Sequence, residues 1–186
     1  DPRFRRNDEN NQFVFVCLIT TSEFLSKRRV CHTPVGMGHG SSTVTLGRGC
    51  LRIGTIMHEI NHALGSWHEQ SRHDRDNYIT IDFSNIEKGH EHNFVKYTDI
   101  DEEGQHYDYE SVMHYSAHAF AHDRRKPTIT PKQRGAVIGQ RTHLSPIDIK
   151  EMQILYGWSN RFSTWHFNDE CETESGHLSV YDNIVI

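Results

Sequence analysis

The sequence lacks any long apolar run. Its longest stretch, Phe13 to Ile19, falls far short of the roughly 20 residues that a membrane span needs, and it favours a buried strand. The chain also lacks an excess of positive charge, since 20 Lys and Arg against 25 Asp and Glu give a net charge of -5. We therefore expect no membrane span and no nucleic-acid partner. No basic, apolar and small-residue leader opens the sequence, so we expect any signal peptide to have been removed or to lie outside it.

Cysteine is scarce, and no two cysteines form a C-x-x-C pair. The four cysteines are an even number, which favours two disulfides over a thiolate metal site or free thiols. Histidine, by contrast, is abundant, with 15 residues. Because His is the commonest metal ligand but also occurs on many surfaces, only the spacing of these residues can indicate a metal site.

The length of 186 residues suits one domain with its own core, and the chain shows no internal repeat. Residues 1–12 are almost all polar or charged and contain Arg3-Phe-Arg-Arg6. We expect this segment to be a flexible arm or a propeptide remnant. The folded domain is expected over residues 13–171, followed by a tail or linker over residues 172–186.

Two segments show helical signals. After Leu51, apolar residues recur at steps of three and four, at Ile53, Met57, Ile60 and Leu64. This periodicity predicts a helix that Gly65 is placed to end. Further on, Ser145 followed by Pro146 predicts the start of a second helix. Between the first strand and the first helix, the alternation of Thr43 to Leu46 predicts an edge strand.

The first expected helix contains H-E-x-x-H, extended by x-x-G-x-x-H, from His58 to His68. Positions i and i+4 lie on one face of a helix, so His58 and His62 can present ring nitrogens to a single ion. Gly65 lacks a Cβ, so it can take positive φ and end the helix, which lets His68 turn back toward the same ion. Three imidazoles with a fourth position left for water are typical of a catalytic zinc site.

Glu59 follows the first ligand directly. Zinc lowers the pKa of a bound water to about 7, and Glu59 is placed to accept its proton and to pass it to the departing amine. The pattern predicts an enzyme that hydrolyses internal peptide bonds with one Zn2+ per chain. Two alternatives stay open: a zinc-binding but inactive protein, and a non-enzymatic domain with a structural zinc. Glu59 beside a ligand and the open fourth position argue against the second.

The motif resembles the zinc signature of the metzincins, and Glu69 after His68 makes it similar to the astacin family in particular. A second similarity lies roughly 45 residues beyond the third ligand, where Ser111-Val-Met-His-Tyr115 resembles the family's Met-turn. Together with shorter matches, the similarity spans about residues 31–157. The resemblance identifies residues 13–171 as an astacin-like zinc metalloendopeptidase domain.

The resemblance implies an α+β, metzincin-like fold. A twisted sheet and the active-site helix form the N-terminal subdomain, and a mostly irregular C-terminal subdomain with one terminal helix lies across a cleft. Within this frame, Met113 is expected beneath the zinc. Tyr115 is expected to reach the metal through its hydroxyl and to donate a hydrogen bond to the oxyanion. The resemblance also places Thr43 to Leu46 at the rim of the cleft, where a peptide could pair with it.

The resemblance further implies two disulfides, Cys31–Cys50 and Cys17–Cys171, and hence a secreted protein in an oxidising, extracellular setting. It ties Glu69 to the mature amino terminus of the family. Because only 16 residues precede Cys17, we expect the amino-terminal part to be shorter than in the family, natively or because the sequence is a fragment. The partner of Glu69 is therefore left open.

Other histidines receive no functional role from the sequence. The four-residue spacing of His114, His118 and His122 would suggest a second metal site on a helix, but the resemblance makes that segment irregular. His90 and His92 lie in a strongly charged stretch and are expected on the surface.

Overall fold

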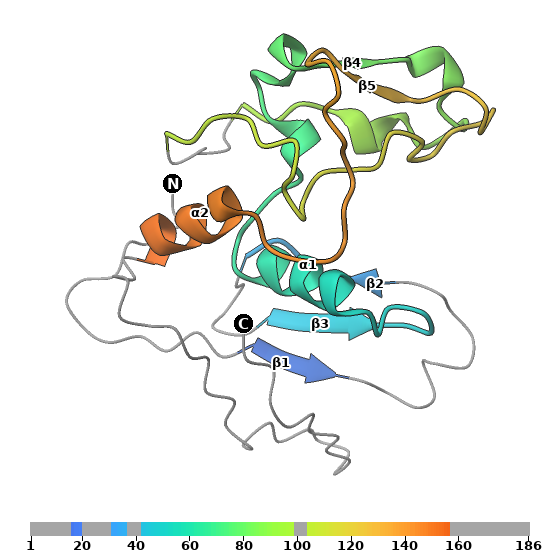
Figure 1. Cartoon of the computed structure of the whole chain (residues 1–186). Coiled ribbons are helices and arrows are strands. Elements are labelled where there is room, and N and C mark those ends of the chain that lie inside the picture. Colours follow the sequence, from blue (N-terminus) through green and yellow to red (C-terminus); the bar gives the residue numbers. More distant parts are fainter. Residues whose placement is uncertain (1–15, 20–30, 37–41, 99–103, 157–186) are drawn as a thin grey trace.

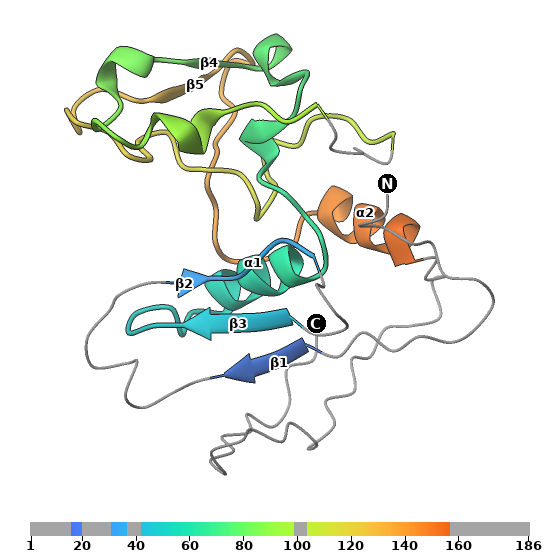
Figure 2. The same cartoon turned by 180° about the vertical axis from the view of Figure 1, so that it is seen from behind.

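The computed structural model describes residues 16–19, 31–36, 42–98 and 104–156. Helix α1 (Ile53–Ala63) lies against a small sheet, and strands β4 and β5, which follow it in the chain, sit among short helical turns (Figure 1). Helix α2 (Pro146–Tyr156) lies beside this arrangement in both views (Figures 1 and 2). This α+β arrangement confirms the predicted fold class.

The first sheet contains strands β1 (Val16–Ile19), β2 (Cys31–His32) and β3 (Ser42–Leu46). Its order is β1-β3-β2, with β1 parallel and β2 antiparallel to β3. The prediction that Thr43 to Leu46 forms an edge strand is therefore wrong, because β3 is paired on both sides. Alternation along a strand indicates which side chains share a face, but it does not reveal how many neighbours the strand has.

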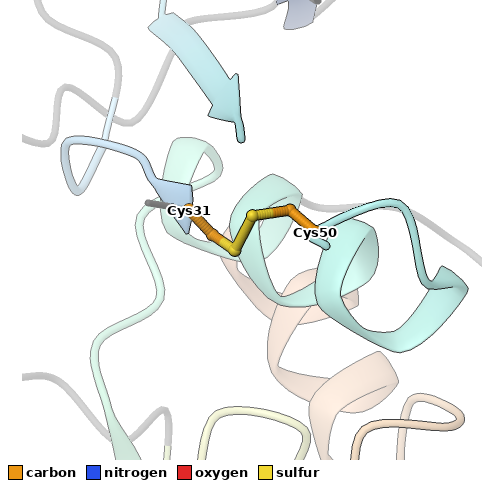
Figure 3. Close-up of a disulfide and its surroundings, with 2 residues drawn as sticks. All are labelled: Cys31 and Cys50. Atoms are coloured by element: carbon orange, nitrogen blue, oxygen red, sulfur yellow. A yellow bond between two sulfur atoms is a disulfide. The ribbon is translucent and has the colours of Figure 1, made fainter. Parts of the chain in front are cut away.

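The core between α1 and this sheet is small and includes a disulfide. Val44, Leu46 and Ala63 are buried together with Cys50. The predicted disulfide Cys31–Cys50 is present and joins β2 to the segment that leads into α1 (Figure 3). The second predicted pair, Cys17–Cys171, lies outside the described residues because Cys171 is not among them.

The C-terminal subdomain, which follows the metal motif from Glu69 onward, has its own core and little regular structure. Strand β4 (Ile79–Ile81) pairs antiparallel with β5 (Ile129–Pro131), and their residues Ile79 and Ile129 pack with Phe94, Tyr107 and other buried residues. Apart from helix α2, its remaining described elements are short 3-10 turns: Glu69–Ser71, Arg75–Asn77, Phe83–Asn85 and Glu91–Phe94. This confirms the prediction of a mostly irregular C-terminal subdomain with one terminal helix.

Helix α2 begins where the sequence predicts. The Ser145 hydroxyl accepts a hydrogen bond from the Asp148 N–H at 2.9 Å, and the Asp148 carboxylate accepts one from the Ser145 N–H at 2.8 Å. This reciprocal pair satisfies two backbone donors that the helix itself leaves without partners. In the part of the chain that the structure describes, neither α1 nor α2 has the length and apolar character of a transmembrane helix.

Gly54, in the first turn of α1, allows a backbone contact that a side chain would prevent. A Cβ at this position would lie 1.9 Å from the Arg141 carbonyl oxygen. The loop that carries Arg141 can therefore reach the helix only because residue 54 is glycine.

We expect Gly54→Ala to lower the free energy of unfolding by roughly 2–3 kcal/mol, because the new methyl group meets backbone atoms that cannot move aside. Helix propensity alone predicts the opposite, a gain of about 1 kcal/mol. Urea unfolding at a fixed zinc concentration measures the difference. Thr55→Ala, one position further along the same helix, is the control and should stabilise slightly. An equal gain from Gly54→Ala would contradict the close contact.

Candidate metal centre

Helix α1 carries two of the predicted ligands on its buried side. Its most buried residues include His58, Glu59 and His62, whereas Ile53, from the predicted apolar stripe, is 49% exposed. The periodicity therefore predicts the helix correctly but does not identify its most buried face. The buried face of α1 is largely the face that carries the metal motif.

The end of α1 brings the third histidine back toward the first two. Gly65 has φ of 106°, its N–H donates to the His62 carbonyl at 3.0 Å, and the Ser66 N–H donates to the Asn61 carbonyl at 2.9 Å. This pair of bonds around a left-handed glycine is the Schellman motif, which stops a helix sharply. The chain then reverses, and His68 reaches the ring of His62. The role predicted for Gly65 is confirmed.

The three imidazoles converge through one nitrogen each. His62 Nε2 and His68 Nε2 are 3.1 Å apart, and His68 Nε2 and His58 Nε2 are 3.4 Å apart. Nitrogens bound tetrahedrally to one zinc at 2.0–2.1 Å lie about 3.3 Å from one another. The separations therefore fit a zinc ion bound by all three. Among the described residues, these three form the one His, Cys, Asp or Glu group with such spacing.

Hydrogen bonds on the opposite ring nitrogens fix which nitrogen faces the centre. His58 Nδ1 lies 2.9 Å from the Val112 carbonyl, and His62 Nδ1 lies 2.8 Å from the Ser66 carbonyl. A carbonyl only accepts, so each Nδ1 carries the proton and each Nε2 offers a lone pair. Lone pairs about 3.3 Å apart repel one another unless a cation lies between them. The donor set therefore suits a metal ion.

The charge state of the ligands agrees with this geometry. Burial lowers the pKa of His58 to about 3 and that of His62 to about 4, with nearby Arg141 as a further cause. Burial, together with the neighbouring His62 and His58, lowers the pKa of His68 well below its ordinary value. All three rings are neutral near pH 7, as metal coordination requires.

Glu59 lies beside the ligands as a buried carboxylate. It is 4% exposed, and its Oε2 has no hydrogen-bond partner in the described part of the chain. Burial raises its pKa, while the Thr33 hydroxyl, His32 and Arg141 lower it. A carboxylate in this setting can accept a proton from a neighbouring water.

Tyr115 lies against the third ligand. Its ring centroid is 4.5 Å from that of His68, and Phe94 and Phe120 pack on the ring from further away. Burial raises the pKa of Tyr115, so its hydroxyl remains a hydrogen-bond donor. Met113, two residues earlier, is buried in the same turn. Its predicted place beneath the metal stays a prediction.

The turn before Met113 is held by helix α2. The Asp148 carboxylate accepts hydrogen bonds from the Ser111 hydroxyl at 2.6 Å and from the Val112 N–H at 2.9 Å. Because the carbonyl of Val112 orients His58, Asp148 supports a ligand that it does not touch. The Ser145 hydroxyl also bonds to Asp108, which ties the start of α2 to the segment before the turn.

Glu69 finds partners among the described residues. Its Oε1 accepts a hydrogen bond from the Asp108 N–H at 2.7 Å and lies 3.4 Å from an Arg72 guanidinium nitrogen. These contacts connect the residue after the third ligand with the segment that precedes the Met-turn. Residues 1–15, which the resemblance to the family linked to Glu69, lie outside the described residues.

Sequence reasoning gave no role to several residues that support the centre. They are Thr33, Gln70, Tyr107, His114, Arg141 and Asp148. For Gln70, its place two residues after His68 was an available signal. Asp148 was visible only as part of a helix start. His114 lies inside the Met-turn motif, but no local pattern relates it to Thr33, Tyr107 or Arg141, which come from other parts of the chain.

Comparisons with known proteins agree with this geometry. The family profile described as Astacin, a peptidase family, matches residues 19–157, which extends the predicted similarity toward the amino terminus. Zinc metalloproteinase nas-15 of Caenorhabditis elegans is 45% identical over 131 residues, covering 69% of this chain and 23% of the relative. Meprin A subunit beta of Rattus norvegicus is 44% identical over 148 residues, covering 77% of this chain and 21% of the relative.

A solved structure is similar as well. High choriolytic enzyme 1, a hatching enzyme zinc-protease from Oryzias latipes, matches with a TM-score of 0.68 at 35% identity, covering 80% of this chain and 72% of that one. The chain spans less than a quarter of the two curated relatives. The matched region contains the three converging histidines and the Met-turn, and the chain therefore belongs to the astacin family of peptidases, with an astacin-type zinc metalloendopeptidase domain.

Proposed function

We propose that this chain supplies the catalytic domain of a secreted zinc endopeptidase, with zinc held by His58, His62 and His68. The convergence of three Nε2 atoms, each 3.1 or 3.4 Å from a neighbour, is the observation that carries the proposal. When bound, zinc supplies a Lewis acid that polarises a carbonyl and lowers the pKa of water. The chain's own residues supply the proton transfers and orient the reacting groups.

Glu59 is proposed as the general base and then the general acid. It adjoins His58 on the buried side of α1, and its Oε2 makes no hydrogen bond within the described residues that would occupy it. A buried carboxylate takes a proton from the attacking water, because protonation removes the cost of holding a charge there. It then gives that proton to the departing amine nitrogen.

Tyr115 is proposed as a hydrogen-bond donor to the oxyanion that forms at the cleaved carbonyl. The packing of its ring against the third ligand, His68, supports this role. A donor that is positioned before the reaction stabilises the developing charge without reorganisation. The substrates are proteins or peptides. The Cys31–Cys50 disulfide supports action outside the cell, where such bonds persist.

We expect Glu59→Gln to bind one zinc per chain, as wild type does, and to lose at least roughly 100-fold in kcat, because an amide cannot accept the proton. Zinc content by elemental analysis and cleavage of an unfolded protein substrate provide the two measurements. Glu87→Gln makes the same change at an exposed position and should leave both quantities unaltered.

Three outcomes of this experiment would contradict the proposal in different ways. A wild type that binds zinc but cuts nothing indicates an inactive member of the family. A Glu59→Gln variant that keeps its rate removes Glu59 from the mechanism. A zinc requirement for folding with no hydrolysis in any variant indicates a structural metal.

Tyr115→Phe removes only the phenol hydroxyl. We expect kcat to fall by roughly 100- to 1000-fold, the range found when one oxyanion donor is lost, while KM and zinc content change little. Steady-state kinetics on a peptide substrate separate the two constants. A rise in KM with unchanged kcat would instead assign Tyr115 to ground-state binding.

A further inference from the structure

The backbone around Tyr115 is held by side chains. Tyr115 belongs to no helix or strand. Its N–H donates to Gln70 Oε1 at 3.0 Å, and its carbonyl accepts a hydrogen bond from His114 Nδ1 at 2.7 Å. The preceding carbonyl, that of His114, accepts from an Arg141 guanidinium nitrogen at 2.9 Å. The position of the Tyr115 ring therefore depends on these side-chain contacts.

His114 can hold the Tyr115 carbonyl in only one of its neutral forms. The ring is fully buried, at 0% exposure, and burial lowers its pKa to about 4, so it carries one proton at neutral pH. To donate to the carbonyl, that proton must sit on Nδ1, which leaves Nε2 as an acceptor. The Tyr107 hydroxyl lies 2.7 Å from Nε2 and can donate to it. The Tyr115 carbonyl thus fixes the neutral form of His114, and the Tyr107 hydroxyl anchors the nitrogen on the other side of the ring.

Tyr107 is itself fixed in place. Its ring is buried and stacks on Tyr78, with centroids 4.6 Å apart and an interplanar angle of 10°. The Arg72 guanidinium lies 5.5 Å from the ring centroid, and Arg72 is held in turn by two hydrogen bonds to Asp74. Burial raises the pKa of Tyr107, which keeps its hydroxyl protonated. The donor to His114 is thus rigid and permanent.

We propose that Tyr107 and His114 are positioning residues for Tyr115, acting through the hydrogen bonds Tyr107–His114 and His114–Tyr115. This inference rests on the role proposed above for Tyr115. Without the Tyr107 hydroxyl, the buried Nε2 of His114 loses its hydrogen-bond partner and the ring loses one of its two anchors, so its hydrogen bond to the Tyr115 carbonyl is held less firmly. The Tyr115 ring, which packs on His68, then samples a wider range of positions, and this slows a reaction that depends on the alignment of Tyr115.

Tyr109 offers a matched control for a purely structural effect. Its hydroxyl donates to the Tyr78 carbonyl at 2.7 Å, and its ring packs 5.2 Å from that of Tyr107 in the same core. Tyr109→Phe removes the same group as Tyr107→Phe and also breaks one hydrogen bond. It leaves His114 and Tyr115 untouched.

A double-mutant cycle tests the proposal through kinetics. We expect Tyr107→Phe to lower kcat roughly tenfold with KM within about twofold, and Tyr109→Phe to leave kcat within about twofold. In a Tyr115→Phe background, Tyr107→Phe should lower kcat by less than about twofold, because the Tyr115 hydroxyl that it helps to position is already absent. Equal losses in both backgrounds, or an equal loss from Tyr109→Phe, would overturn the proposal.

A second measurement does not depend on activity. In protein with 13C-labelled tyrosine rings, the Tyr115 signal is identified by its absence in Tyr115→Phe. We expect this signal to shift or broaden in Tyr107→Phe, with and without zinc, and to stay in place in Tyr109→Phe. An unmoved Tyr115 signal overturns the inference even in an active enzyme. A moved signal in a protein that cleaves nothing overturns the proposed function instead and leaves the positioning contact in place.

Variants of His114 complete the test. The side-chain amide of Asn can occupy the place of the imidazole Nδ1, so His114→Asn keeps a donor for the Tyr115 carbonyl, whereas His114→Leu keeps none. We expect His114→Asn to retain at least about fivefold more kcat than His114→Leu when both are fully zinc-loaded. Equal kcat values would show that the hydrogen bond to Tyr115 carries no catalytic effect.

Discussion

The hydrogen bond between His58 Nδ1 and the Val112 carbonyl joins the two halves of this domain. Its partners are 54 residues apart in the sequence, and it is 2.9 Å long and buried. On one side it orients a ring on α1. On the other side it engages the turn that leads to Tyr115. In this turn the Val112 N–H donates a hydrogen bond to the Asp148 carboxylate of α2. The backbone of Val112 therefore connects one metal ligand, His58, with the Met-turn and with helix α2.

This connection matters because the C-terminal subdomain has little regular structure to keep it rigid. Its loops are fixed by side chains that bond to backbone groups. Asn85 is an example: its amide donates to the carbonyls of Asp123 and Lys126, and its oxygen accepts from the Asp123 N–H. Thr128 donates to the Ala119 carbonyl in the same manner. Such bonds satisfy buried backbone groups in the absence of helices or sheets and so stabilise irregular segments.

The parts of the structure that could be predicted from the sequence are those with local signals. Gly65 predicts where α1 ends, and Ser145 with Pro146 predicts where α2 begins. Both predictions succeed because helix termination and capping involve residues within one turn. The convergence of the three histidines could be predicted for the same reason, since His58 and His62 share one face of α1 and His68 comes just after the end of this helix. Each of these predictions concerns contacts within about ten residues.

The features that could not be predicted depend on contacts between distant segments. The central place of β3 requires β1, and periodicity within a strand carries no information about its neighbours. The spacing of His114 indicates only a possible metal pattern and no other role, whereas its buried contacts are with Tyr107 and Tyr115. Arg141 reaches the centre only because Gly54 leaves room for its backbone. The resemblance to the astacin family predicts the overall fold, but these contacts between distant segments are seen only in the structure.

The central claim is that three imidazoles bind one zinc through Nε2, with His58 and His62 oriented by hydrogen bonds at Nδ1. X-ray absorption at the zinc edge of the loaded wild-type protein tests it directly. We predict three imidazole nitrogens at about 2.0–2.1 Å and no sulfur ligand at about 2.3 Å. A spectrum that shows fewer than three imidazoles, or a sulfur in the first coordination shell, would contradict it.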